Sequence, residues 1–291
     1  MHDFVEQIWR LVLRREPDPD TLGRVERGEV SRTRVVRELV ASREFELVEL
    51  LDDGLARARL ERARGGRPRE LLAPAWADER AIEIPWCLAR YGGERRVLDI
   101  GSANAVPAYL EGLHDLAARE LVTVDLTEPA DVIADVRDLP FEDGSFDLAY
   151  CVSTLEHVGR DNSVYEVEGG RDEHGDEAAL RELRRVARRT IVSVPVGVAE
   201  DQGWQIVRPP ADWIELFERS GFVVFEDELY VRGADGWRSA TVAEAEAARY
   251  GGSRQGAGAV LLAELRPSRP SEKLRLAVRD RRYPGEPRRS T

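Results

Sequence analysis

The sequence predicts an α/β protein in which a small all-α module precedes a doubly wound, mostly parallel sheet. Four short, continuously apolar runs lie between residues 96 and 194, as expected for parallel strands covered on both faces. Helical stretches separate these runs, which is the pattern of βαβ units. The first 64 residues show helical periodicity instead.

The N-terminal segment, residues 1–64, predicts several short helices. Phe4, Ile8 and Val12 share one helical face, and the proline-containing run 16–20 ends that helix. Residues 14–18 and 41–45 resemble a small helical domain of unknown function that is attached to bacterial enzymes and surface proteins. The resemblance implies an accessory module without chemistry of its own, through which we expect a protein partner to bind.

From residue 75 to residue 266, helices and strands alternate. We expect helices over 78–91 and 177–188, and strands over 96–100, 121–125, 146–152 and 190–194. Two later apolar runs, 222–225 and 259–263, predict strands that pair as an antiparallel edge. Beyond this domain, residues 267–291 are rich in arginine and proline. They predict a disordered basic tail, with an arm that binds anionic membrane or nucleic acid as the alternative.

Composition limits the class of protein. With 42% hydrophobic residues among 291, the chain can bury a sizeable core, and its net charge of −12 argues against a nucleic-acid binder. No run of about 18 apolar residues predicts a transmembrane helix. Two cysteines are too few for a disulfide framework or a zinc site, so we expect a cytoplasmic protein.

The first predicted strand ends in an acidic residue and a tight turn of small residues. Asp99 is followed by Gly101, Ser102 and Ala103, and ligands bind beyond the carboxyl ends of such strands. A dinucleotide fingerprint needs three glycines, but this chain has one, followed by Ala103 and Val106. An NAD-dependent oxidoreductase is therefore the alternative to the function considered below.

Two further acidic residues follow the next strand. Asp125 lies 26 positions after Asp99, where its carboxylate can accept hydrogen bonds from ribose hydroxyls, with Leu126 beside it. Asp135 can accept a hydrogen bond from an adenine amino group, and the N–H of Val136 can contact the ring. This spacing predicts an adenosine site.

Taken in order, these motifs resemble the class I S-adenosylmethionine-dependent methyltransferases over about residues 75–266. Asp99-Ile100-Gly101 matches the acidic-x-Gly opening motif, Asp125 the ribose-binding acid, and Asp135 the acid on the adenine side. The resemblance implies a Rossmann-like fold and S-adenosylmethionine as cofactor. Ala103 and Ala105 depart from it, because the family usually has glycine there.

The resemblance places residues 153–158 beside the sulfonium of the cofactor, with Ser153 as a cofactor contact. His157 is then a candidate general base for a hydroxyl acceptor, since its ordinary pKa suits proton removal. A histidine that is hydrogen-bonded to backbone at a strand–helix junction is the structural alternative.

Function follows as an expectation. We expect methyl transfer to a small-molecule or sugar hydroxyl, in cell-surface glycan assembly, and a non-catalytic scaffold that keeps the fold is a further alternative. We expect no metal, although the acidic loop 161–176 offers oxygen ligands that suit magnesium.

Overall fold

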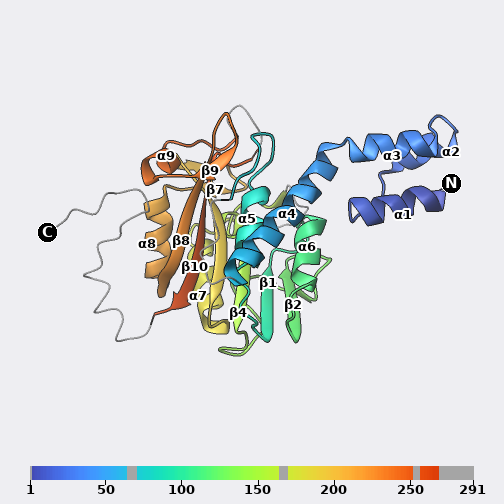
Figure 1. The fold of residues 1–291 in the computed structure, drawn as a ribbon. Helices are drawn as coiled ribbons and strands as arrows, with labels where there is room; N and C mark the ends of the chain where they lie inside the picture. Colours follow the sequence, from blue (N-terminus) through green and yellow to red (C-terminus); the bar gives the residue numbers. More distant parts are fainter. Residues whose placement is uncertain (1, 64–70, 164–169, 252–255, 269–291) are drawn as a thin grey trace.

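A mixed eight-stranded sheet forms the centre of the molecule (Figure 1), and its strand order is β3-β2-β1-β4-β5-β10-β8-β9. The computed structural model describes residues 2–63, 71–163, 170–251 and 256–268. Neighbours among the first five strands are parallel: β1 (Arg96–Ile100), β2 (Glu120–Asp125), β3 (Val132–Ile133), β4 (Leu148–Val152) and β5 (Thr190–Val196). β10 (Ala259–Pro267) runs antiparallel between β5 and β8 (Phe222–Arg232), and β9 (Trp237–Ser239) forms the edge.

Helices cover both faces of this sheet, which confirms the doubly wound α/β prediction. One apolar core packs β strands against α7 (Gly175–Val186) and α8 (Pro210–Arg219), with Leu183 and Trp213 fully buried. The other packs the opposite face against α5 (Arg80–Leu88) and α6 (Pro107–His114), with Trp86 and Leu113 buried. Among the described residues, the remaining short elements are the 3-10 turn η1 (Leu155–His157), the hairpin β6 (Glu200–Asp201) and β7 (Ile206–Val207), and α9 (Val242–Glu246).

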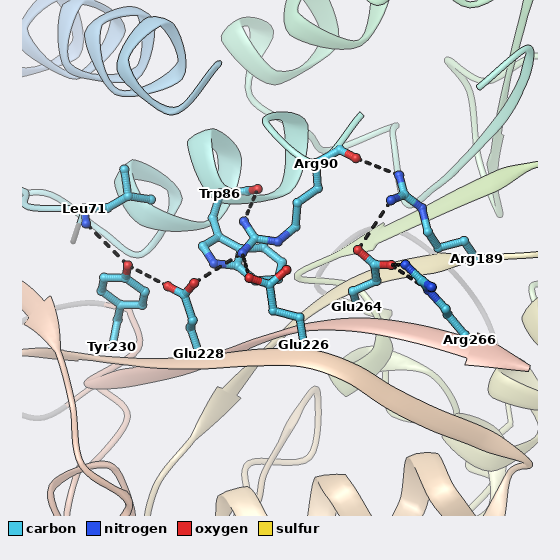
Figure 2. Close-up of polar contacts among 9 residues, drawn as sticks. All are labelled: Leu71, Trp86, Arg90, Arg189, Glu226, Glu228, Tyr230, Glu264 and Arg266. Carbon is cyan, nitrogen blue, oxygen red and sulfur yellow. Dashed lines mark hydrogen bonds and ion pairs between the residues drawn. The ribbon is translucent and has the colours of Figure 1, made fainter. Parts of the chain in front are cut away.

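The predicted strands are confirmed, and the two late runs form the expected antiparallel pair. β8 extends beyond the predicted run 222–225 and continues through the acidic residues 226–228 to Arg232. Arg90, which is fully buried just after α5, explains the extension (Figure 2). Its guanidinium lies 3.0 Å from Glu226 and 3.2 Å from Glu228, and it stacks on the Trp86 ring. The acidic strand is therefore neutralised from the neighbouring helix layer.

Four helices precede the sheet: α1 (His2–Val12), α2 (Pro19–Glu26), α3 (Arg32–Val40) and α4 (Arg43–Ala63). Residues of α1 to α3 form a small core of their own around Trp9 and Val35. α4 is longer than the sequence suggests and runs from these helices down onto α5 and α6 (Figure 1). Leu51 of α4 is buried in the core beneath α5, and a Cβ on Gly54 would lie 2.9 Å from Pro85 Cγ. Thus α4 packs closely against the α/β domain.

Three sequence predictions lie partly or wholly outside the described residues: the linker at Gly65-Gly66, most of the basic tail and the middle of the acidic loop. Within the described ranges, every helix is either too short or too polar to cross a membrane.

Candidate active site

A cavity of about 480 Å³ opens at the carboxyl ends of β1, β2 and β4, where ligands bind in open α/β sheets. Its volume lies in the range of small-molecule sites. Seven of the ten predicted site residues line it: Gly101, Asp125, Leu126, Asp135, Val136, Ser153 and His157. The other three, Asp99, Ser102 and Ala103, are absent from its lining.

Gly101 begins the turn after β1 and has to be glycine for two reasons. Its φ of +92° is in the region that side chains disfavour, and a Cβ there would lie only 2.1 Å from Thr154 Oγ1. Ala103 and Ala105 carry no positive φ, so a methyl group is tolerated at both positions. The departure from the usual glycine pattern is thus compatible with this backbone.

Asp99 and Ser102 support the turn from beneath. Asp99 is fully buried and accepts a hydrogen bond from the Tyr109 hydroxyl at 2.5 Å. Burial raises the pKa of Asp99 to about 7, against the effect of the Tyr109 hydroxyl. Ser102 is also buried. Both residues therefore shape the turn from below the cavity.

Asp125 ends β2 and organises the rim of the cavity. Its carboxylate accepts the N–H of Ala103 at 2.8 Å and the N–H of Leu126 at 2.7 Å, which ties the β1 turn to the end of β2. Each carboxylate oxygen has two lone pairs, so both can accept a further hydrogen bond from a ligand. This arrangement fits a pair of ribose hydroxyls.

Asp135 follows β3 on the same side of the cavity. It accepts the backbone N–H of Arg137 at 2.8 Å, and the Arg137 side chain pairs with it at 2.6 Å. Burial acts in the opposite direction, but these hydrogen bonds hold the pKa of Asp135 below its usual value. An ionised carboxylate beside the Val136 backbone is suited to accept an adenine amino group.

Ser153 lies where β4 ends and has the strained φ of +46°. Its hydroxyl donates to Glu83 at 2.7 Å, and its N–H donates to the Ser193 hydroxyl at 3.0 Å. Glu83 belongs to α5, so the end of β4 is fixed to the helix that precedes β1.

His157 ends η1 and stacks on Trp204, with ring centroids 5.1 Å apart. Its Nδ1 lies 3.0 Å from the Trp204 carbonyl oxygen, which can only accept, so the neutral ring carries its proton on Nδ1. Burial lowers the pKa of His157 to about 4. The ring is therefore neutral at pH 7, with its lone pair on Nε2.

Sequence reasoning missed a group of buried carboxylates in the same cavity, Glu79, Glu83 and Glu156. Burial raises the pKa of Glu83 to about 7, with the neighbouring charge of Glu79 as the next cause. The available signal was Glu83 itself, a charged residue in the otherwise apolar run Ala81–Leu88.

The acidic loop holds no metal cluster in its described part. Arg137 pairs with Asp172 at 3.1 Å, and Arg208 pairs with Asp176 at 2.6 Å. No group of three or more ligating side chains suited to a metal ion was found within the described ranges.

Comparisons with known proteins point in one direction. Residues 98–190 match the family model described as a methyltransferase domain. No curated protein matches the chain. Among solved structures, the Burkholderia thailandensis 1,6-didemethyltoxoflavin-N1-methyltransferase is 15% identical, with 91% of each chain covered and a TM-score of 0.41. A SAM-dependent methyltransferase from Methanosarcina mazei is 11% identical, covering 61% of this chain and 94% of its own, also with a TM-score of 0.41.

These structural similarities are weak, and the assignment rests on the family match together with the cavity. The glycine turn at Gly101 and the acids Asp125 and Asp135 meet around one space of suitable size. Residues 98–190 therefore match a methyltransferase domain, and this segment contributes Gly101, Asp125 and Asp135 to the cavity.

Proposed function

We propose that the protein methylates a hydroxyl group of a small-molecule acceptor, a sugar of cell-surface glycan assembly, with His157 as the general base. One observation carries the proposal: Asp125, Asp135 and His157 line a single cavity, so cofactor and acceptor fit into one continuous space. The two cysteines, Cys87 and Cys151, are free and buried, which suits the cytoplasm.

When bound, S-adenosylmethionine would supply a methyl group on a cationic sulfur, and the sulfur would keep the C–S electron pair as the acceptor oxygen bonds the methyl carbon. The chain's own residues position the reactants. Asp125 and Asp135 hold the adenosine part, and Gly101 lets the backbone approach the cofactor closely. Ser153 and its partner Glu83 fix the end of β4, where the methyl group is presented. Positioning of this kind supplies much of the rate in a one-step displacement.

His157 takes the acceptor's proton. Its Nδ1–H bond to the Trp204 carbonyl fixes the tautomer, so Nε2 accepts the hydroxyl proton and later releases it to solvent. Because burial keeps the pKa of His157 at about 4, the ring stays in its base form well below pH 7. Turnover limited by this group would fall only as the pH drops through about 4.

The test measures S-adenosylhomocysteine formed from S-adenosylmethionine with a panel of free and nucleotide-linked sugars. His157→Ala should lower turnover by about 10²–10⁴-fold with cofactor affinity nearly unchanged. His114→Ala is the matched control, because His114 is exposed at the end of α6. Turnover of His157→Ala within about threefold of wild type would contradict the base role.

Calorimetry separates the alternatives. We expect binding of S-adenosylmethionine and none of NAD; tight NAD binding would favour the oxidoreductase alternative. Cofactor binding without turnover on any acceptor would favour the scaffold. We also propose that the N-terminal helices bind a protein partner. A pull-down with the full chain tests this, and the chain that lacks residues 1–41 is its control.

A further inference from the structure

One wall of the cavity is unusually acidic. Glu79 and Glu83 come from the start and the first turn of α5, and Glu156 comes from η1 after β4. All three are buried and line the cavity. Segments about 70 residues apart in the chain therefore bring three carboxylates to one wall.

One oxygen of Glu156 lacks the partner that a buried carboxylate needs, while the other, Oε1, lies 3.8 Å from His157 Nε2. Glu156 is 3% exposed, and its Oε2 is sealed from solvent with no hydrogen-bond partner in the described part of the chain. Glu83 is fully buried; its Oε2 accepts the hydroxyl of Ser153, an uncharged donor, and its Oε1 has no hydrogen-bond partner among the described residues. Glu79 is held by the backbone N–H of Ala257 at 3.1 Å. An unpartnered buried acceptor is costly, so it indicates a missing donor.

The nearby basic groups leave this wall short of positive charge. Arg80 faces the same acids, but it pairs with Asp78 at 3.4 Å and is more than one-third exposed. On the other side of η1, Asp176 of α7 is matched by Arg208. His157 is neutral, since burial lowers its pKa to about 4. Glu79, Glu83 and Glu156 thus outnumber the cations available to them.

The pKa values reflect this shortage. Burial, together with the neighbouring acids, raises the pKa of Glu83 to about 7 and the pKa of Glu156 well above its usual range. The raised pKa values therefore favour the protonated forms of these two carboxyl groups. A cation seated between them would stabilise the charged forms and release those protons.

Aromatic rings complete the surroundings. Trp204 lies edge-on to Tyr250, with ring centroids 6.2 Å apart, and both line the cavity with the acids. Aromatic faces attract ammonium groups, most strongly where water is excluded. Carboxylates and aromatic rings in one pocket form a typical environment for a protonated amine.

We propose that the acceptor carries a protonated amine that is held by Glu156 and Glu83, close to the hydroxyl that is methylated. This deepens the function proposed above and rests on it. An ammonium group has three donors and no acceptor, which matches a wall of acceptors. Amino sugars are the simplest acceptors with this chemistry, and a neutral or N-acetylated sugar lacks the cation.

Binding tests the proposal directly. The full chain, saturated with S-adenosylhomocysteine, is titrated calorimetrically with glucosamine and galactosamine and with their N-acetyl counterparts. At about pH 6.5 both amines are protonated. We expect each amine to bind at least about tenfold more tightly than its N-acetyl counterpart. The binding enthalpy should differ between phosphate and Tris buffers, because the carboxyl groups release protons on binding.

Variants identify the wall. Glu156→Gln keeps the shape and removes the charge, so it should abolish most of the amine preference and the buffer dependence. Glu83→Gln should act in the same direction, which covers the case that one variant fails to fold. Glu215→Gln is the matched control, since Glu215 is exposed on α8. Melting temperatures of all three verify folding.

Three results would overturn the proposal. The first is equal or tighter binding of the N-acetyl sugars, and the second is failure of every amine in the panel to bind. The third is a Glu156→Gln variant that binds S-adenosylmethionine more weakly, relative to S-adenosylhomocysteine, but binds the amines as the wild type does. Glu156 would then face the sulfonium of the cofactor and not the amine of the acceptor. Formation of S-adenosylhomocysteine is measured separately, so failure of the amine preference leaves the proposed function testable by turnover.

Discussion

Gly101→Ala is the sharpest test of the cofactor turn, because the structure gives two separable costs. Alanine at a φ of +92° costs about 1–2 kcal/mol of conformational strain. The added Cβ also meets Thr154, at 2.1 Å from Oγ1 and 2.8 Å from Cγ2. Forcing an extra methyl group into such a contact typically costs about 1–3 kcal/mol. We therefore expect a loss of about 2–5 kcal/mol in the free energy of unfolding, together with weaker cofactor binding.

Gly144→Ala is the control for the strain alone. Gly144 has a φ of +65°, but a Cβ there would meet nothing within 4 Å. Gly144→Ala should therefore lose only about 1–2 kcal/mol in the free energy of unfolding. Urea denaturation gives both free energies, and calorimetry gives the affinity for S-adenosylmethionine.

Thr154→Ala isolates the steric part. It removes Oγ1 and Cγ2, so the nearest remaining Thr154 atom is Cβ, at 3.0 Å from the new methyl group. On its own it loses the hydroxyl bond to the Val152 carbonyl, about 1 kcal/mol. The double variant Gly101→Ala with Thr154→Ala should lose about 1–3 kcal/mol less in the free energy of unfolding than the two single variants lose together. The steric argument would be refuted if Gly101→Ala and Gly144→Ala lowered the free energy of unfolding equally and the losses of Gly101→Ala and Thr154→Ala simply added in the double variant.

Three further predictions concern the rim, the acidic wall and α4. Asp125→Ala should weaken S-adenosylmethionine binding by about 1.5–3 kcal/mol, measured by calorimetry, and unchanged affinity would exclude Asp125 as the ribose ligand. Because burial raises the pKa of Glu83 to about 7, its proton stabilises the folded protein at low pH, and this stability is lost as the pH rises from about 4.5 to 7. Glu83→Gln should flatten that part of the pH profile in urea denaturation, and parallel profiles would contradict the buried charge. A chain that starts at residue 42 should stay folded, whereas one that starts at residue 72 loses Leu51 from the core and should melt at lower temperature; equal melting temperatures would show that α4 is dispensable.

The sequence predicts the parallel strands well because each is a local apolar run whose burial needs no knowledge of distant residues. Prediction from the sequence fails where a charged residue is neutralised by a residue that is distant in the chain. Glu226 and Glu228 look like the end of a strand until Arg90, some 136 residues earlier, is seen to lie between them. The spacing of Gly101, Asp125 and Asp135 along the chain is characteristic, and the structure brings all three to one cavity.

The acidic wall was out of reach for the same physical reason. Glu83 interrupts an apolar helix, but nothing in the chain says that it meets Ser153 and lies on the same wall as Glu156. The pKa of His157 also depends on burial, which spacing does not reveal. Local patterns predict the helices and strands and most of the residues that line the cavity, while charges buried by tertiary contacts have to be read from the structure.

The Arg90 cluster holds the end of α5, the helix whose start carries Glu79 and Glu83 of the acidic wall. A buried guanidinium is costly unless it is paired, so Arg90 attaches one end of α5 to β8 through Glu226. Glu79 attaches the other end of the helix to the backbone of Ala257. The acidic wall on α5 therefore has one resting position. Trp204, in the turn between β6 and β7, also lines the cavity, and this hairpin is held by the ion pair of Asp201 with Arg160 at 3.3 Å. We expect acceptor choice to change by replacement of this turn, with the carboxylates kept as a fixed reference point.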